Sequence, residues 1–352
     1  MSLKANNPYR WKSWQVTGIG VSAIVSLFLL DLSLGSVKIS VPELLNIMAG
    51  KASKQSWEYI FFNFRLPKAI SALLTGAGIS VAGLQMQTLF KNPLAGPSVL
   101  GISHGASLGG AVFVLSSTAL FGASFNFQET LGSWGLVLFA VSGSFLVLLS
   151  VLFASARISD GVTVLIVGLM FGFITGAVVN ILQFFSDPEL IQNFLVWTFG
   201  SLAGVTWSQL QVMGPIILLS LGLSLVFSKQ MNALLLGENY ATGVGVNVKR
   251  TRIRLILITS VMAGTITAFT GPIAFIGVAV PHLARLLFRT SNHKILLPAT
   301  MMCGMVIMLI CDIVSQVPGS QTTLPLNSIT ALFGGPVILA IIIKNKQMKG
   351  AF

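Results

Sequence analysis

Residues 131–154 read LGSWGLVLFAVSGSFLVLLSVLFA, a run that contains no Asp, Glu, Lys or Arg. An uncharged apolar run of roughly 20 residues can cross the hydrocarbon core of a bilayer as an α-helix. Apolar stretches of similar length recur along the chain. We therefore predict an all-α polytopic membrane protein.

The composition of the whole chain agrees with this class. Of 352 residues, 54% are hydrophobic and 9% are charged, whereas a soluble globular domain carries about 25% charged residues. Too few charged side chains remain to cover a water-exposed surface. The 35 glycines suit close helix packing in a bilayer, because small residues let helix backbones approach each other.

The apolar segments predict about ten transmembrane helices within one membrane domain, residues 1–352. The first is read as a retained helix and not as a cleaved signal peptide, because no small-residue cleavage site follows it. The seventh and eighth are divided at Gly271-Pro272, a dipeptide that breaks a helix. The segments lie at 14–31, 66–90, 98–121, 131–154, 161–185, 209–228, 255–270, 273–289, 296–316 and 329–343.

The distribution of basic residues predicts the orientation. An even number of spans places both termini on one side. With the termini in the cytoplasm, most of the 21 Lys and Arg residues lie on inner segments, as the positive-inside rule requires. The outer segments keep only Lys38, Lys51, Lys54, Arg65 and Lys68. We expect a bacterial inner-membrane protein with cytoplasmic termini and two short outer surface helices, one beginning near Pro42 and one at about 188–203.

Three other functional classes are poorly supported. The net charge of +12 is spread in short clusters between apolar runs, so nucleic-acid binding is not expected. Residues 101–105 (GISHG) match a hydrolase motif but lack the strand that must precede it, so we predict that the chain is not an enzyme. Cys303 and Cys311 are the only cysteines, and their spacing within one apolar segment predicts neither a disulfide framework nor a metal site.

An ion-coupled secondary carrier is the competing class of transporter. Such carriers usually keep ionisable residues at mid-membrane depth. Here the deepest candidate, Asp312, falls toward the outer end of its span, and we interpret it as a polar group satisfied between helices.

Small residues recur every four positions on two predicted spans. Such faces are typical of close helix packing. The functional interpretation is that the two faces approach each other, or a partner subunit, and slide during gating. The faces consist of Gly168, Gly172 and Gly176 on the fifth span, and Ala72, Gly76 and Ser80 on the second.

The inner loop at 231–252 reads MNALLLGENYATGVGVNVKRTR and predicts two short helices on the membrane surface. Exposed apolar residues of this kind mark a protein contact or a segment lying among lipid headgroups. The residues alone leave both readings open. No G-x-x-x-x-G-K-[ST] loop occurs in the chain, so ATP, if it drives the protein, binds to another subunit.

Several long motifs, in order from Arg65 onward, resemble the FecCD-type permeases, the membrane subunits of ABC importers for iron-siderophores, haem and cobalamin. The motifs are RLPK (65–68), GLQMQTLFKNPLAGPSVLGISHGAS (83–107), LLLGENYATGVGV (234–246), GPIAFIGVAVPHLAR (271–285), HKILLP (293–298) and LPLNSITALFGGP (324–336).

The resemblance implies a type II ABC importer permease: a homodimer with two cytoplasmic ATPase subunits, which bind ATP and Mg²⁺, and a substrate-binding protein outside. The chain itself is expected to hold no metal or cofactor. Residues 232–246, within the loop at about 229–252, would form the ATPase-coupling helices. The implied coupling residues are Asn232, Leu234, Leu235, Gly237, Glu238, Ala241 and Gly245.

The resemblance also implies roles for two further groups of residues. Arg65 and Lys68 would receive acidic residues of the binding protein. The stretch 159–163 corresponds to the loop that closes the pathway, with Asp160 a departure from its usual small hydroxyl residues and Thr163 at its end. The gating face of Gly168, Gly172 and Gly176 would lie next to it.

Two departures from the family pattern fall on the predicted outer side. Gln316 stands where Arg is common after the aspartate of the ninth span. The usual Glu-Leu-Pro-x-Gly reads TLPLN at 323–327. Both bear on how a binding protein docks. We expect a metal chelate as cargo, with a ferric siderophore ahead of haem and cobalamin.

Overall fold

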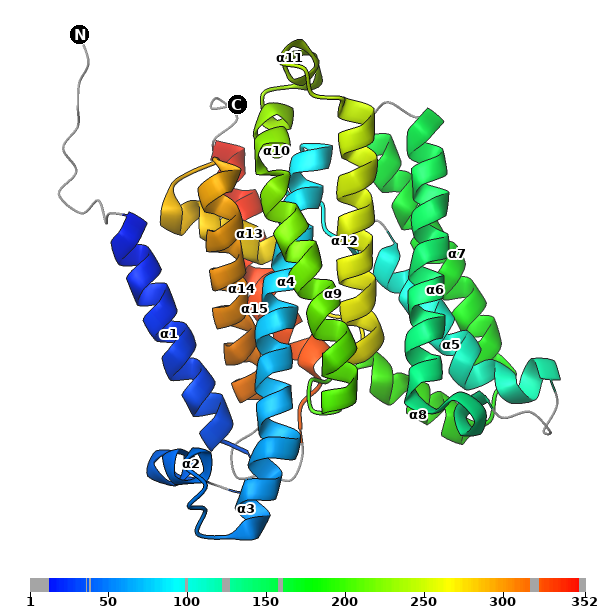
Figure 1. Ribbon diagram of the computed structural model, residues 1–352. Helices are drawn as coiled ribbons and strands as arrows, with labels where there is room; N and C mark the ends of the chain where they lie inside the picture. The colour runs from blue at the N-terminus through cyan, green and yellow to red at the C-terminus, as the bar shows by residue number, and fades with distance from the viewer. Residues whose placement is uncertain are drawn as a thin grey trace.

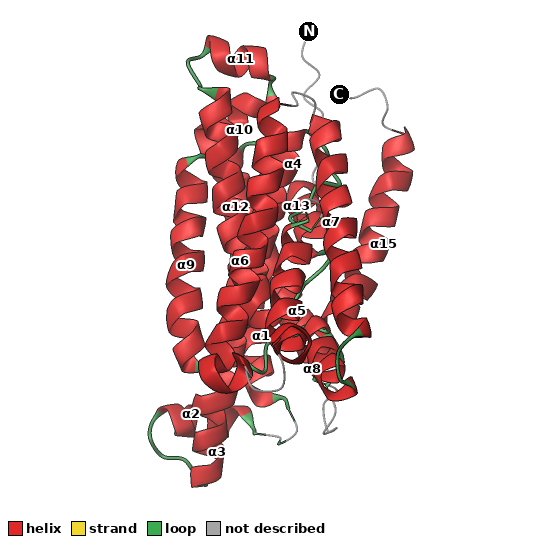
Figure 2. Ribbon diagram, turned by 90° about the vertical axis from the view of Figure 1, so that its right-hand side faces the viewer, coloured by secondary structure: helices red, strands yellow, loops and turns green. Residues whose placement is uncertain are grey.

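The computed structural model describes residues 13–35, 37, 39–98, 101–121, 127–157, 161–316 and 323–347. Throughout these residues the regular structure is helical (Figure 2). A helix is found at each of the predicted apolar segments. These helices are α1 (Ser13–Ser33), α4 (Leu66–Phe90), α5 (Ile102–Phe121), α6 (Phe127–Arg157), α7 (Gly161–Phe184), α9 (Trp207–Val226), α12 (Val248–Thr270), α13 (Ile276–Phe288), α14 (His293–Ser315) and α15 (Leu326–Gln347).

Within the described residues, seven helical segments are long and apolar enough to cross a membrane, and three apolar helices are shorter. The shorter ones lie at 102–115, 276–288 and 326–340, in α5, α13 and α15. An all-α membrane fold is thus confirmed, while the count of ten crossings stays a prediction. A helix of 13 residues such as α13 rises only about 20 Å, less than the ~30 Å hydrocarbon core.

Short helices gather at the two ends of the bundle (Figure 1). One end carries α2 (Val41–Met48), α3 (Gln55–Ile60), the π-helical stretch η1 (Phe61–Arg65) and α8 (Pro188–Thr198). The other carries α10 (Ser228–Leu235) and α11 (Glu238–Gly243), together with the start of α1 and the end of α15. Following the predicted orientation, we call the first the outer end and the second the inner end.

The predicted surface helices are confirmed. α2 has Pro42 in its first turn, and α8 begins at Pro188, with Asp187 preceding it and Glu189 in its first turn. Proline suits the first helical positions because its missing N–H has no partner there anyway. α8 ends at Thr198, five residues earlier than the predicted 203.

α4 forms the centre of the bundle and is buried along almost its whole length. It packs against α9, α12, α13 and α14. Two glycines allow this close packing: a Cβ at Gly76 would overlap the backbone of Gly304 on α14, and one at Gly83 would overlap the backbone of Gly277 on α13. Small residues at such crossings let helices gain van der Waals contact in a bilayer.

The predicted division at Gly271-Pro272 is confirmed. α12 ends at Thr270, the chain runs without helix through 271–275, and α13 then begins at Ile276. Gly271 has a φ of 73°, a conformation that glycine adopts without strain. Non-helical backbone at membrane depth is tolerated where protein surrounds it and completes its hydrogen bonds.

Hydrogen bonds from two other segments complete this break. The backbone N–H of Ser201 donates to the carbonyl of Thr270 over 2.9 Å. The N–H of Ala274 donates to Oδ1 of Asn327 over 3.0 Å, while the N–H of Asn327 donates to the carbonyl of Phe199 over 3.0 Å. Asn327 therefore ties the start of α15 to the break and to the end of α8.

The contact between α4 and α14 yields a stability prediction. Gly76→Ala should destabilise the protein by about 1–3 kcal/mol, because the new methyl group must push α14 away from α4. The measurement is thermal unfolding of the purified protein in detergent. Gly222→Ala on α9 is the matched control, since nothing lies within 4 Å of its added Cβ. Equal melting temperatures for the two variants would contradict the proposed contact.

Candidate functional site

The inner end carries a helical hairpin made of α10 and α11. The two helices are joined at Gly237, whose φ of 120° is strained for any residue with a side chain. Leu234 and Ala241 are buried against the body of the protein. Leu236 and Tyr240, in contrast, are 68% and 51% exposed. The hairpin thus packs one face on the bundle and presents apolar side chains on the other.

The predicted coupling residues all lie in this hairpin or directly after it. Leu235 is 38% exposed, and Gly245, with a φ of 84°, follows the end of α11. Glu238 forms an ion pair with Arg252 of α12, 2.6 Å between Oε1 and Nη2. Asn232 donates from Nδ2 to Oδ1 of Asn292 over 2.9 Å. The two predicted short helices are confirmed, and their contact with an ATPase stays a prediction.

A cleft of about 390 Å³ opens beside the hairpin. The C-terminal end of α4 forms one wall and the turn between α10 and α11 forms the other. Its lining mixes apolar and charged side chains and comprises Leu89, Phe90, Lys91, Leu236, Gly237, Glu238, Asn239 and Arg252. The inner end is therefore hollowed next to the exposed apolar face, as a surface that receives another protein would be.

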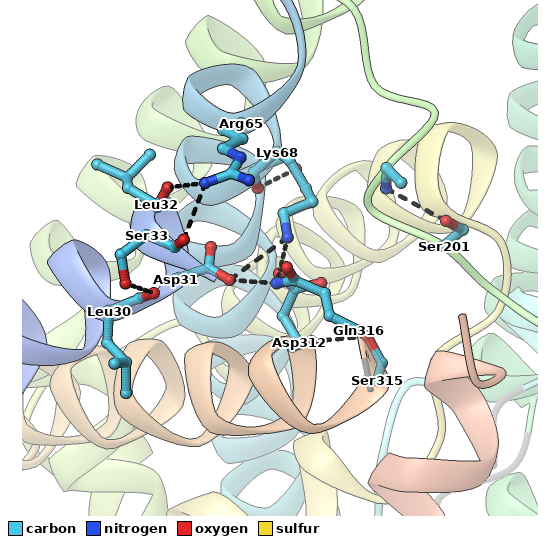
Figure 3. Close-up of polar contacts among 12 residues, drawn as sticks. Leu30, Asp31, Leu32, Ser33, Arg65, Lys68, Ser201, Asp312, Ser315 and Gln316 are labelled. Atoms are coloured by element: carbon cyan, nitrogen blue, oxygen red, sulfur yellow. Dashed lines mark hydrogen bonds and ion pairs between the residues drawn. The ribbon is translucent and has the colours of Figure 1, made fainter. Parts of the chain in front are cut away.

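Five side chains form an outer polar cluster: Asp31, Arg65, Lys68, Asp312 and Gln316 (Figure 3). They come from α1, η1, α4, α14 and the residue after α14. Lys68 Nζ lies 2.8 Å from Oδ2 of Asp312 and 3.4 Å from Oδ1 of Asp31. The side-chain amide of Gln316 donates to both carboxylates, over 2.6 Å to Asp31 and 3.2 Å to Asp312.

Arg65 and Lys68, which we expect to receive acidic residues of a binding protein, are buried in this cluster. They are only 6% and 8% exposed, and their docking role stays a prediction. Nη1 of Arg65 donates to the carbonyls of Leu32 and Ser33 over 2.6 and 3.0 Å, and Nη2 donates to the carbonyl of Val37. In the isolated chain these cations are therefore engaged by the protein itself.

Asp31 is the member of the cluster that sequence reasoning missed. It lies at the end of the first apolar span, where a single carboxylate in an otherwise uncharged helix is a recognisable signal. Asp31 is fully buried, and Asp312 is 3% exposed. The interpretation of Asp312 as a polar group satisfied between helices is confirmed by its ion pair with Lys68.

Within the chain the two small-residue faces contact different helices and not each other, and the alternative, contact with a partner subunit, stays a prediction. Gly76 on α4 faces Gly304 of α14. On α7, an added Cβ at Gly172 would lie 3.3 Å from the ring of His104 in α5, and the carbonyl of Gly168 lies close to Gly101. Spacing along one helix indicates that it packs closely, but not against which neighbour.

Among the described residues, Gly176 and Thr163 are not brought together into a site. Gly176 has open space at its Cβ position. Thr163 lies in the first turn of α7. Asp160 lies outside the described residues. Their roles in the pathway stay predictions.

Comparison with known proteins identifies relatives over nearly the whole chain. The sequence model of the FecCD transport family matches residues 23–344. The hemin transport system permease protein HmuU of Yersinia pestis is 32% identical over 93% of this chain and 94% of its own length. The vitamin B12 import system permease protein BtuC of Citrobacter koseri is 32% identical over 82% of this chain and 84% of its own length.

A solved structure agrees with these relatives. It is an inward-facing ABC transporter, provisionally assigned to the metal-chelate type, with a TM-score of 0.82 and 27% sequence identity. The match covers 95% of this chain and 100% of the solved chain. The similarity therefore extends over nearly the whole chain.

The outer polar cluster yields a second stability prediction. Lys68→Met should cost about 3–5 kcal/mol of unfolding free energy in detergent, because it leaves two buried carboxylates without their shared cation. Adding Asp312→Asn to Lys68→Met should recover part of the loss. Lys51→Met, at an exposed position, serves as the control and should stay within about 0.5 kcal/mol. If Lys68→Met were as stable as Lys51→Met, the ion pairs of Lys68 would not contribute to the stability of the fold.

Proposed function

The chain belongs to the FecCD transport family, and from that premise we propose that it forms the translocation pathway of an ATP-driven importer for a metal chelate. Permease subunits of this family are membrane components of ABC importers, and ATP hydrolysis belongs to a separate subunit. The observation that carries the proposal is the match over residues 23–344 together with the fold shared with a metal-chelate type transporter. It favours ATP coupling over the ion-coupled carrier considered from the sequence.

We place the ATPase contact on the α10–α11 hairpin. Its apolar side chains Leu236, Tyr240 and Val244 are exposed at the inner end. Contiguous exposed apolar side chains beside a cleft are typical of a protein-binding surface. ATP and Mg²⁺ would be held by that partner, two copies of which would serve a permease homodimer.

The homodimer and its central pathway are part of the same proposal. α7 presents Phe173 and Ile174 on its outward face, 69% and 58% exposed. Such a face needs cover from lipid or from a second copy of the chain, and the second copy would enclose a pathway between the two. Gly176, whose added Cβ meets nothing within 4 Å, lies on the same helix.

A substrate-binding protein would dock at the outer end, where α2, α3 and α8 lie. Arg65 and Lys68 could take part in docking only if the outer polar cluster opens, because Asp31 and Asp312 pair with Lys68 and backbone carbonyls hold Arg65. Lys51, which is exposed between α2 and α3, requires no such opening.

The cargo is proposed to be a ferric siderophore, with haem and cobalamin as the alternatives. Haem is favoured by one specific observation, namely that the Yersinia pestis relative is a hemin permease. The test is ATP-dependent uptake into proteoliposomes that contain the permease, its ATPase and its binding protein. The three probes are a ⁵⁵Fe-loaded siderophore, haemin and cyanocobalamin.

Uptake of the iron-siderophore alone would support the proposed cargo. ATP-dependent uptake of haemin or cyanocobalamin instead would overturn the proposed cargo but support the proposed importer function. Uptake that needs a proton gradient and no ATPase would overturn ATP coupling.

The hairpin yields a prediction about assembly. Leu236→Asp should abolish co-purification of the ATPase in mild detergent, because a charge replaces an exposed apolar contact, and it should leave the melting temperature unchanged. Mass spectrometry of the purified complex reports the partner. Leu45→Asp is the matched control, since Leu45 is 60% exposed on α2 at the outer end. Retention of the ATPase by Leu236→Asp would show that the ATPase does not bind through this face of the hairpin.

A further inference from the structure

The side chain of Asn232 connects the hairpin to the start of α14. Its Oδ1 accepts a hydrogen bond from the backbone N–H of His293 over 2.8 Å and lies 2.8 Å from Nδ1 of the same residue. A backbone N–H can only donate, so the acceptor is the amide oxygen, and Nδ1 must carry the proton that faces it. The amide nitrogen is used as well, because it donates to Asn292.

The other edge of the His293 ring reaches α4. Its Nε2 lies 2.8 Å from Oγ1 of Thr88, and this hydroxyl also lies 2.9 Å from the carbonyl of Leu84. His293 is fully buried. One imidazole ring therefore joins α10, α14 and α4, and we call Asn232, His293 and Thr88 the inner junction.

α4 and α14 are tied together a second time at the outer end. There Lys68 of α4 pairs with Asp312 of α14 over 2.8 Å. Between the two ties, Gly76 and Gly304 hold the helices in backbone contact. From Lys68 to Thr88 a helix rises about 30 Å, the thickness of a bilayer core. The two helices thus form one unit that is fastened at both faces of the membrane.

The alternative tie between the hairpin and the bundle is weaker. The ion pair of Glu238 with Arg252 lies at the surface, where the Glu238 side chain is 50% exposed. Exposed pairs of this kind contribute little, because water and salt screen them. The contacts of Asn232 with His293 are partly buried and the contact of His293 with Thr88 is buried, so breaking them leaves groups that keep a desolvation penalty.

We propose that Asn232 and His293 are positioning residues that couple the α10–α11 hairpin to the α4–α14 pair. Movement that an ATPase imposes on the hairpin is then passed along α14 to Asp312 and Gln316, and from Gln316 to Asp31 on α1. This inference rests on the proposed ATP-driven function. It adds a defined mechanical connection between the inner end and the outer polar cluster.

The test measures whether a signal at the inner end reaches the outer end. The assembled permease–ATPase complex is loaded with a non-hydrolysable ATP analogue, and amide hydrogen exchange is followed over residues 309–316. In the wild-type complex, exchange in this segment should change when the analogue binds. In Asn232→Ala that change should shrink about tenfold, the factor that one lost hydrogen bond implies, in the complexes that retain the ATPase.

Three further variants separate positioning from general stability. Asn232→Asp keeps the acceptor for both N–H groups of His293, so it should restore the response at 309–316. Asn193→Ala, at an exposed site on α8, should behave as the wild type. His293→Ala combined with Asn232→Ala should be no worse than either single change, because both remove the same connection.

The outcomes are distinct. An unchanged response in Asn232→Ala, or independent effects that multiply in the double variant, would overturn the coupling role. Loss of the ATPase from Asn232→Ala but not from Asn232→Asp would also overturn it, by assigning Asn232 to docking. A wild-type chain that never retains an ATPase would refute the proposed function itself.

Discussion

The close contact of α4 with α14 at Gly76 and Gly304 is the constraint on which the rest of the structure depends. In a bilayer no hydrophobic effect drives helices together, so close van der Waals packing and interhelical polar contacts supply the attraction. Once the two helices touch, their ends hold polar groups at fixed positions. Lys68 meets Asp312 at the outer end, and Thr88 meets His293 at the inner end. The polar groups satisfy one another because the glycines have set the separation.

The break between α12 and α13 shows that backbone polar groups within the membrane, like polar side chains, are paired with other groups of the protein. An N–H or carbonyl left unpaired within the membrane costs several kcal/mol, of the order expected for transfer to an apolar medium. Asn327 supplies one of the missing acceptors, to the N–H of Ala274. This residue stands at one of the positions where the sequence departs from the family pattern. The structure gives that position a local role in completing the break.

The sequence alone located the helices well, because apolar length, proline and glycine act locally. The start of α8 at Pro188 and the break at Gly271 are examples. The setting of Arg65 and Lys68 could not be read in this way. The carboxylate partners of Lys68, Asp31 and Asp312, and the carbonyls of Leu32 and Ser33 that hold Arg65 are distant in the chain, and only the packing of α1 and α14 on α4 brings them close. The partners of Gly76 and Gly172 escaped prediction for the same reason.

The two ends of the molecule differ in what they offer a partner. At the inner end, the apolar side chains of Leu236 and Tyr240 are already exposed. At the outer end, two of the cations that could attract an acidic protein face inward. Separating a buried ion pair costs about 3–5 kcal/mol, which corresponds to more than a hundredfold in affinity. A binding protein would therefore gain more from exposed cations such as Lys51 unless the outer polar cluster opens first. Because that cluster lies on the α4–α14 pair, its opening and the movement of the inner hairpin would be physically linked.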